Sequence, residues 1–528
     1  MKILNAKQIR AVDQATIKNL NIKSIDLMEK AAAKCFEWIE LQDHIDENNS
    51  IHVFCGMGNN GGDGLALGRM LNLEFYDVKV YTVHFSDTMS DDFIANFNRA
   101  EEFEIHPISI HAEDDFPEIS ANDFVIDAIL GSGLNKVPVG LTKKMIHHIN
   151  QSGAYVISID IPSGLFIEKN IIDPDSVIKS SLTLSFQLPK LAFLLPENSE
   201  YVQRFELLDI GLNEASILSQ DTPYHYMKRE DIFSFYKKRN KFSHKGNFGH
   251  SLIIGGSFGK IGSVSLACKS ALKIGSGLVT AYIPKCGYNI LQISVSEAMV
   301  EVDANDEIEY INFKAQADVI GIGMGMGNSD ATSKALFKFL ETNSLPIVLD
   351  ADAINIVAQN KEILGFLNEK SILTPHPKEL QRLIGPWKDD FEKLDKLKKL
   401  TTDFPFIVVL KGAHTIIVQN GVYYFNSTGS PALATAGSGD VLTGMITGLL
   451  AQKYSPLQAA IMGVYLHGLS ADVYTSLHPQ ETFIASDIIN LLPGAFNVLL
   501  HPEEKIQEED DDDPDEDFLN DDDDDLPF

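Results

Sequence analysis

The chain has 528 residues, 44% of them hydrophobic, which is enough for two or three domains with substantial cores. Its formal net charge of -31 argues against a nucleic-acid partner, because phosphate backbones recruit basic surfaces. It contains no apolar run long enough to cross a membrane and no secretion signal at its start, and its four cysteines lack a CxxC spacing. We therefore expect a cytoplasmic protein with reduced thiols and no membrane partner.

The first part of the chain, residues 1–215, alternates helical and strand-like apolar patterns. Helical spacing is found at 4–20, 24–41, 63–75 and 142–152. Apolar strand-like runs occupy 51–55, 78–85, 124–130, 155–161 and 181–187. Because apolar strands separated by amphipathic helices form parallel sheets covered on both faces, this pattern predicts a Rossmann-like three-layer α/β/α domain.

Polar residues and glycines follow three of these strands, at 59–64, 127–136 and 160–164. Ligands of open α/β sheets bind at the carboxyl ends of strands, so the three clusters together predict one shared pocket. Each cluster alone could be a simple turn. The first cluster overlaps the glycine spacing of dinucleotide-binding loops, Gly56-x-Gly58-x-x-Gly61, but it places Asp63 inside the expected turn, where its charge would repel a phosphate. Its asparagine and carboxylate oxygens suit a hard cation.

The motifs CGMGNNGGDGLALGRML, DAILGSGL and DIPSGL resemble the signatures of the NAD(P)HX epimerase domain, over about residues 1–215. The substrate of that family is a hydrated nicotinamide dinucleotide. The resemblance implies that Asp160 is the catalytic carboxylate and that Asn60, Asp127 and Ser163 hold a potassium ion. It also implies that the substrate is bound by Asn59, Asn60, Gly61, Gly62, Asp63, Gly131, Ser132, Gly133, Leu134, Asn135, Lys136, Val137 and Asp160.

The chemistry of such a hydrate suits a single carboxylate. Its hydroxyl on C6 is adjacent to ring nitrogen N1, whose lone pair can expel it, and water can return to the other face. A carboxylate placed at C6 could move the proton, a role worth about 10²–10⁴ in rate. From the residues alone, Asp160 could equally cap the turn that follows it.

Residues 212–231 have no strong periodicity, and we place a domain boundary there. A second α/β pattern covers 225–500, with helical spacing at 263–276 and 440–452. Its strand-like runs are 250–256, 278–283, 318–323, 345–352, 371–376 and 406–412. Residues 501–528 are predicted to be an acidic disordered tail, which like-charge repulsion keeps solvated, rather than a metal-binding or docking segment.

The sequence AGSGD at 436–440 is expected to open a helix whose free N–H groups suit an anion. There Asp440 could act on a hydroxyl facing a phosphate, or could simply cap the helix. Together with KGNFGHSLIIGGSFGKIGS, GIGMGMG, LDADAIN, TPHPKEL and LKGAHT, this motif closely resembles the ADP-dependent NAD(P)HX dehydratase domain, which has a ribokinase-like fold. The resemblance implies that the adenine nucleotide is bound by Lys411, Gly412, Ala413, His414, Thr415 and Gly439. It implies that the hydrated ring is faced by Ser263, Gly325, His376 and the catalytic Asp440.

Two positions depart from the family pattern, since Met324 replaces a usual proline and Ser263 a common alanine. The glycine-rich run around Met324 could also be only a strand-to-helix turn. His376, between two prolines, could contact the ring or hydrogen-bond a backbone carbonyl. A nucleotide is needed because hydroxide is a poor leaving group, whereas phosphoryl transfer to the hydroxyl would make phosphate the leaving group. In this reaction Asp440 would be the general base, and Mg²⁺ would bridge the phosphates. The preference for ADP over ATP comes from the resemblance alone.

These features predict a bifunctional repair enzyme that epimerises the R and S forms of NAD(P)HX and dehydrates the S form with ADP, releasing AMP and phosphate. The family resemblance also implies a homo-oligomer. One alternative is a kinase for a small vitamin or sugar, with a regulatory N-terminal domain, which would accumulate a phosphorylated product. Another is a protein-binding first half, against which the intact Asn60, Asp127, Asp160 and Ser163 count.

Overall fold

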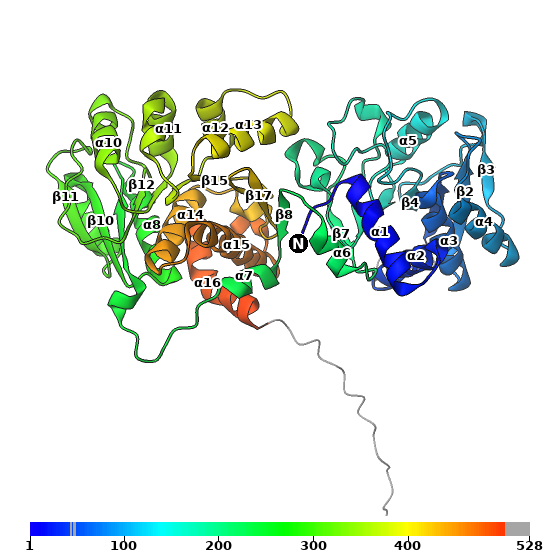
Figure 1. Ribbon diagram of the computed structural model, residues 1–528, viewed down its shortest axis with the longest axis horizontal. Coiled ribbons are helices and arrows are strands. Elements are labelled where there is room, and N and C mark those ends of the chain that lie inside the picture. The colour runs from blue at the N-terminus through cyan, green and yellow to red at the C-terminus, as the bar shows by residue number, and fades with distance from the viewer. Residues whose placement is uncertain (43–44, 46–48, 502–528) are drawn as a thin grey trace, which may run out of the picture.

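The computed structural model describes residues 1–42, 45 and 49–501, so that all but the first residue of the predicted acidic tail lies outside the described residues. The chain forms two sheets, each with its own helices, which occupy the two sides of the molecule (Figure 1). Within the described ranges no helix has the length and apolar character required to cross a membrane.

The first sheet has the strand order β3-β2-β1-β4-β5-β6-β7, and all its neighbours pair in parallel. This is a Rossmann-type order, in which β1, β2 and β3 extend the sheet to one side and β4 to β7 extend it to the other. Its strands are β1 (Ser50–Cys55), β2 (Asp77–Val83), β3 (Ile108–Ile110), β4 (Phe124–Ala128), β5 (Tyr155–Ile159), β6 (Leu182–Phe186) and β7 (Phe205–Leu208). Its helices are α1 (Ala6–Leu20), α2 (Ser24–Glu40), α3 (Asn59–Leu73), α4 (Asp91–Glu102), α5 (Gly140–Ser152) and α6 (Glu214–Ser219).

The second sheet has the order β11-β10-β9-β12-β13-β14-β15-β16-β17-β8 and is parallel except where β16 pairs with its two neighbours. Its strands are β8 (Tyr224–Met227), β9 (His250–Ile254), β10 (Leu278–Pro284), β11 (Met299–Asp303), β12 (Val319–Ile322), β13 (Ile347–Leu349), β14 (Ser371–Leu373), β15 (Ile407–Leu410), β16 (Ile416–Gln419) and β17 (Val422–Asn426). Its helices are α7 (Arg229–Phe235), α8 (Ile261–Ile274), α9 (Tyr288–Ser294), α10 (Asp330–Thr342), α11 (Ala351–Gln359), α12 (Pro377–Ile384), α13 (Asp390–Asp403), α14 (Ser438–Ala451), α15 (Pro456–Thr475) and α16 (Ala485–Leu500).

The apolar patterns located the central strands of both sheets, but they missed the edge strands and one hairpin. The short edge strands β3, β7, β8 and β11 were not predicted, nor was the β16–β17 hairpin, which lies inside the second sheet between β15 and β8. Edge strands are paired on one side only and carry fewer buried residues, as in β7, where no residue is fully buried. The hairpin also makes the second sheet mixed rather than wholly parallel.

Helix α3 begins at Asn59, four residues earlier than its apolar pattern suggested. Gly58 is the N-cap, so the predicted turn NNGGD is in fact the opening of the helix and Asp63 lies within it. The expectation that Asp63 lies inside a turn is therefore wrong. Gly61 permits this early start, because a Cβ there would lie 1.8 Å from the carbonyl oxygen of Gly56.

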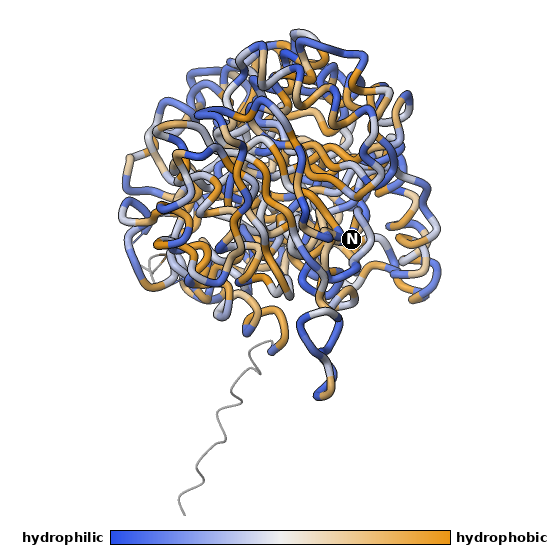
Figure 2. The backbone as a smooth tube through the Cα atoms, turned by 90° about the vertical axis from the view of Figure 1, so that its left-hand side faces the viewer, coloured by the Kyte–Doolittle hydropathy of each residue, from blue (hydrophilic) through white to orange (hydrophobic). Residues whose placement is uncertain are grey.

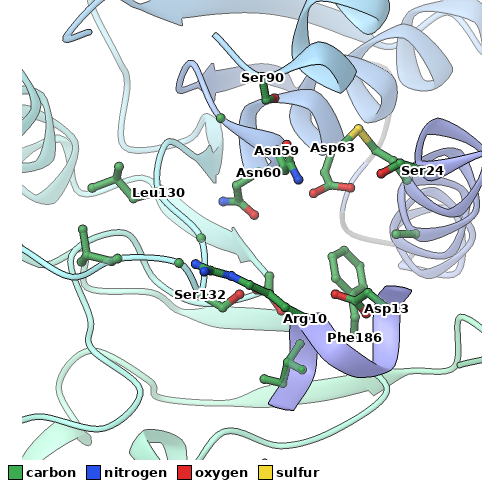
Figure 3. A pocket seen from close by; sticks show the side chains of 18 of the residues that line it. Arg10, Asp13, Ser24, Asn59, Asn60, Asp63, Ser90, Leu130, Ser132 and Phe186 are labelled. Atoms are coloured by element: carbon green, nitrogen blue, oxygen red, sulfur yellow. The ribbon is translucent and has the colours of Figure 1, made fainter. Parts of the chain in front are cut away.

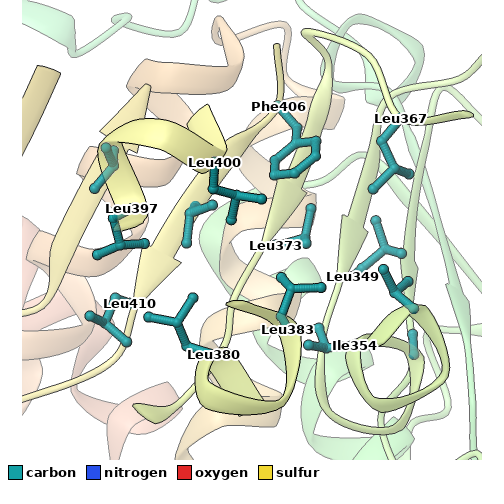
Figure 4. Packing of buried hydrophobic residues seen from close by; sticks show 14 of the residues in the cluster. Leu349, Ile354, Leu367, Leu373, Leu380, Leu383, Leu397, Leu400, Phe406 and Leu410 are labelled. Atoms are coloured by element: carbon teal, nitrogen blue, oxygen red, sulfur yellow. The ribbon is translucent and has the colours of Figure 1, made fainter. Parts of the chain in front are cut away.

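Hydrophobic segments run through the middle of the molecule, and most of the hydrophilic segments lie toward its outside (Figure 2). In the second half, Ile354 of α11 and leucines of α12 and α13 pack against the strands β13–β15 (Figure 4). Burying such side chains contributes about 1.5–3 kcal/mol each, which fixes the strand ends that carry the polar residues described below.

The beginning of the chain pairs with the second sheet rather than the first. Ile3 donates to the carbonyl of Tyr224 at 3.0 Å, and Tyr226 donates to that of Met1 at 2.8 Å. These bonds extend the sheet beyond its edge strand β8, which lies between the two halves in Figure 1. Leu191 and Leu194, from the first part of the chain, also pack into the core of the second.

Candidate active sites

The three polar clusters of the first half line a single cavity of about 830 Å³, as the sequence predicted (Figure 3). They are neighbours because the order β1-β4-β5 places the ends of these three strands side by side. Helices α1 and α2, the segment 85–90 before α4, and residues at and after the end of β6 supply other parts of the wall. Ten of the predicted substrate-binding residues line the cavity: Asn59, Asn60, Asp63, Gly131, Ser132, Gly133, Leu134, Asn135, Lys136 and Asp160.

Three other predicted substrate-binding residues, Gly61, Gly62 and Val137, are not among the residues that line the cavity. The two glycines allow close packing, since a Cβ on Gly62 would lie 2.7 Å from the Met28 sulfur. Their part in a site is to bring α3 close to its neighbours rather than to present a side chain.

Asp160 directly follows β5 and adopts a left-handed backbone, with φ of 66°. Its Oδ1 accepts a hydrogen bond from Nζ of Lys190 at 2.5 Å, within a salt bridge whose lysine is 2% exposed. Lys190 also donates to Ser185. Among the described residues Lys190 is the hydrogen-bond partner of this carboxylate, so the alternative that Asp160 caps the following turn is wrong.

Sequence reasoning missed several residues of the cavity wall. Lys190 is a lone charge within the apolar segment 188–195, which could have indicated a buried ion pair. Arg10 and Asp13 come from α1, whose amphipathic pattern gave no reason to separate them from other surface residues. The Arg10 guanidinium lies over the 131–135 loop, 2.8 Å from the position of a Cβ on Gly133.

The cavity raises the pKa of two carboxyl groups. Burial, with the nearby charge of Asp160, raises the pKa of Asp13 to about 6. The same two causes raise the pKa of Asp63 well above its usual value. Neither side chain has a hydrogen-bond or salt-bridge partner in the described part of the chain.

Asp127 and Ser163, two of the predicted potassium ligands, lie buried beneath this cavity. The carboxylate of Asp127 accepts from Ser163 Oγ at 2.5 Å, from the Ser163 N–H at 2.8 Å and from Ser158 Oγ at 2.8 Å. Burial raises its pKa despite these bonds, and no basic group of the described chain pairs with it. The third predicted ligand, Asn60, has a buried amide nitrogen that finds no partner within the described part of the chain.

In the second half, Asp440 is the third residue of α14, which begins after the N-cap Gly437. Asp440 is therefore not the cap, and that alternative is wrong. Burial, with the charge of Asp350 adding to it, raises the pKa of Asp440 to about 6, although Ser263 hydrogen-bonds its side chain. Gly325 lies on the other side of Ser263, with its Cβ position 3.4 Å from Ser263 Oγ. The fold thus brings together three of the four residues predicted to face the ring.

Asp350, at the end of β13, is a buried carboxylate that received no role from the sequence, although its motif LDADAIN was noted. It accepts from Lys411 Nζ and from Thr443 Oγ1, both at 2.8 Å. A Cβ on Gly439 would lie 3.3 Å from the same lysine nitrogen. The ion pair therefore places the Lys411 ammonium beside the start of α14, where an anion would also bind.

His376 caps α12, and its Nδ1 accepts from the backbone N–H of Lys378 at 3.0 Å. The alternative that this ring bonds to a backbone carbonyl is therefore wrong. Its Nε2 lies 3.5 Å from the Glu379 carboxylate. Burial lowers the pKa of His376, which favours the neutral ring that this acceptor role requires.

The predicted nucleotide-binding residues Lys411, Gly412, Ala413, His414 and Thr415 connect β15 to β16. The His414 ring packs against Phe205 of β7 and lies 3.3 Å from the Asn426 carbonyl. This side chain faces the first half of the molecule, so a nucleotide would meet the main chain at this position.

Two α/β sheets, each with buried carboxylates at the carboxyl ends of its strands, define an α/β enzyme with two separate sites of nucleotide-binding type. Residues 251–493 match the family model described as NAD(P)H-hydrate dehydratase, and residues 24–192 match that of the YjeF-related protein N-terminus.

The bifunctional NAD(P)H-hydrate repair enzyme of Moorella thermoacetica is 33% identical, over 96% of this chain and 98% of its own length. That of Escherichia coli is 30% identical, over 93% of each chain. A crystal structure of the ADP/ATP-dependent NAD(P)H-hydrate dehydratase from Bacillus subtilis, with ATP/Mg²⁺, is 27% identical with a TM-score of 0.47, covering 52% of this chain and 98% of that one. The chain belongs to the family of bifunctional NAD(P)H-hydrate repair enzymes.

Proposed function

We propose that this protein repairs hydrated NAD(P)H in two steps, with the cavity of the first half interconverting the R and S epimers. In the second half, the site around Asp440 dehydrates the S epimer with ADP and releases AMP and phosphate. The observation that carries the proposal is the match of one chain to both family models, over nearly the full length of bifunctional relatives. Two activities in one chain suit the chemistry, because hydration yields both epimers and the dehydratase accepts one.

In the first site the pyrophosphate would lie at the start of α3, where the free N–H groups and Arg10 supply positive charge. Asp160 would face C6 of the hydrated ring. Its ion pair with Lys190 fixes the direction of this carboxylate, so that it can accept a proton from the attacking water.

The residues proposed for potassium fit that ion. Asp127 contributes a buried negative charge with no basic partner among the described residues, and Ser163 contributes a hydroxyl beside it. The amide of Asn60, whose nitrogen has no partner among the described residues, can turn its oxygen toward the same place by rotation of the side chain. A bound cation would offset the Asp127 charge and stabilise the loop that follows β4.

In the second site Asp440 would remove the proton from the C6 hydroxyl as that oxygen attacks a phosphate of the nucleotide. The N–H groups that open α14, together with Lys411, would stabilise the charge in transfer. Mg²⁺ neutralises phosphate charge when bound, and it would take most of its ligands from phosphate and water, because Asp350 is already occupied by Lys411 and Thr443.

The test uses chemically hydrated NADH containing both epimers, which are separated by chromatography while absorbance follows the recovered NADH. The wild type with ADP and Mg²⁺ should recover both epimers and release AMP and phosphate. Asp160→Asn should recover only the S epimer, apart from slow spontaneous interconversion. Asp440→Asn should interconvert the epimers but recover no NADH. A stable phosphorylated product would instead support a kinase, and loss of both activities in one variant would contradict two separate sites.

A further inference from the structure

The first cavity contains more carboxyl groups than its proposed chemistry has used. Asp13, Asp63 and Asp160 all line it, and Lys190 is the cation paired with one of them. Asp13 and Asp63 project toward each other from α1 and α3 (Figure 3). Neither has a hydrogen-bond or ion-pair partner among residues 1–42, 45 and 49–501, so both are open to a molecule in the cavity.

Arg10 and Lys136 also line the cavity, but among the described residues neither forms an ion pair with Asp13 or Asp63. If ionised, these two carboxyl groups would each carry a negative charge without a direct counterion in a poorly solvated space, next to the charge of Asp160. Like charges in such a space disfavour ionisation of Asp13 and Asp63. Burial and the charge of Asp160 raise the pKa of Asp13 to about 6, and the same two causes raise the pKa of Asp63 well above its usual value. Asp13 can therefore gain and lose a proton near neutral pH.

We propose that Asp13 is a second acid–base residue of epimerisation, acting on the face of the hydrated ring opposite to Asp160. This inference rests on the proposed function of the first site. Asp13 reaches the cavity from α1 and Asp160 from the end of β5, so the two groups approach a bound ring from different walls. An epimerase that expels a hydroxyl from one face and adds water to the other needs a group on each.

When the C6 hydroxyl is on the Asp13 side, the protonated Asp13 donates its proton to that hydroxyl. The C6–O bond then breaks with its electron pair on oxygen, and water leaves. The N1 lone pair forms the C6=N1 double bond. Water on the other face then attacks C6, the double-bond pair returns to N1, and the Asp160 carboxylate takes the proton of that water. The opposite epimer uses the same two groups in reversed roles.

The two carboxyl groups then share one proton in the active state, and the rate should fall on both sides of a pH optimum. In Asp13→Asn the epimerisation kcat should fall by about 10²–10⁴, with KM changed less than threefold. The fall of the epimerisation rate above the pH optimum, called here the alkaline fall, should disappear, because residue 13 no longer has a proton to lose. Asp13→Glu should restore part of the rate and the alkaline fall, which a merely structural role would not do.

The experiment measures interconversion of purified R and S epimers from pH 5 to 9 with the full-length protein. ADP-dependent dehydration of the S epimer, which should not change, checks that the second half is intact. The matched control is Glu214→Gln, an exposed carboxyl of α6, which packs beside α1. Its rate and pH profile should equal those of the wild type.

Failure of this inference can be separated from failure of the proposed function. If the wild type does not interconvert the epimers, the function proposed for the first site is wrong. If the wild type does interconvert them but Asp13→Asn stays within threefold and keeps the alkaline fall, only the role of Asp13 is wrong. Should Asp13→Asn misfold, a wild-type profile with no alkaline fall would overturn the inference by itself.

Discussion

Replacing Asp440 by asparagine should stabilise the second half of this protein while removing its dehydration activity. Burial and the charge of Asp350 raise the pKa of Asp440 from 3.8 to about 6. This difference of about 2 units corresponds to about 3 kcal/mol at 1.36 kcal/mol per unit, which is the cost of holding the ionised group in the folded state. Asparagine has nearly the same shape and keeps an oxygen for the bond with Ser263, so it should recover most of that energy.

The gain should depend on pH in a definite direction. Below about pH 4 the carboxyl is protonated in both the folded and the unfolded state and costs nothing, so variant and wild type should be equally stable. As the pH rises from 4 to 6, the unfolded carboxyl ionises freely and the folded one does not. The advantage of asparagine should therefore grow across this range and level off above pH 6 at up to about 3 kcal/mol.

Urea unfolding followed by tryptophan fluorescence measures this difference. The chain has two tryptophans, and Trp387 packs against the core of the second sheet, so a Trp38→Phe background reports on that half. The matched control is Asp330→Asn at the exposed start of α10, which should lose about 0.3–1 kcal/mol, since a charge there favours the helix. An Asp440→Asn gain that is absent at pH 7, or is equally large at pH 4, would refute the reasoning.

Three further outcomes are expected. Lys190→Met leaves the carboxylate of Asp160 buried without its partner and should destabilise the first half by about 3–5 kcal/mol in urea unfolding. Gly61→Ala places a Cβ 1.8 Å from a backbone oxygen and should lower the unfolding free energy by about 1–3 kcal/mol, despite the better helix propensity of alanine. Lys411→Met removes a positive charge that lowers the pKa of Asp440, so the acid fall of the dehydration rate should move to higher pH.

Two of these outcomes have a control variant in the same chain. Gly262→Ala lies in α8 with open space around its Cβ position and should be stabilising or neutral, in contrast to Gly61→Ala. Adding Asp160→Asn to Lys190→Met should recover stability by removing the unpaired charge. An acid fall that stays in place in Lys411→Met would mean that another group sets the pH dependence of dehydration.

The sequence by itself determined the architecture of both halves and the position of the first cavity. Apolar strands alternating with amphipathic helices are a local pattern, and the ends of parallel strands meet at one edge of a sheet. It was therefore sufficient to find the polar clusters at 59–64, 127–136 and 160–164 to place them in one cavity. The glycine-rich turn before Asp440 similarly predicted that this residue lies at the start of a helix.

Only the tertiary structure decided which charges meet. Lys190 pairs with Asp160 from 30 residues away, and Lys411 pairs with Asp350 from 61 residues away. Asp13 reaches the same cavity from a helix whose pattern marks it only as amphipathic. No local periodicity encodes such pairings, because they depend on strand order and on how helices pack across a sheet. Burial, and with it the pKa of each carboxyl group, follows from that packing and not from the neighbouring residues in the chain.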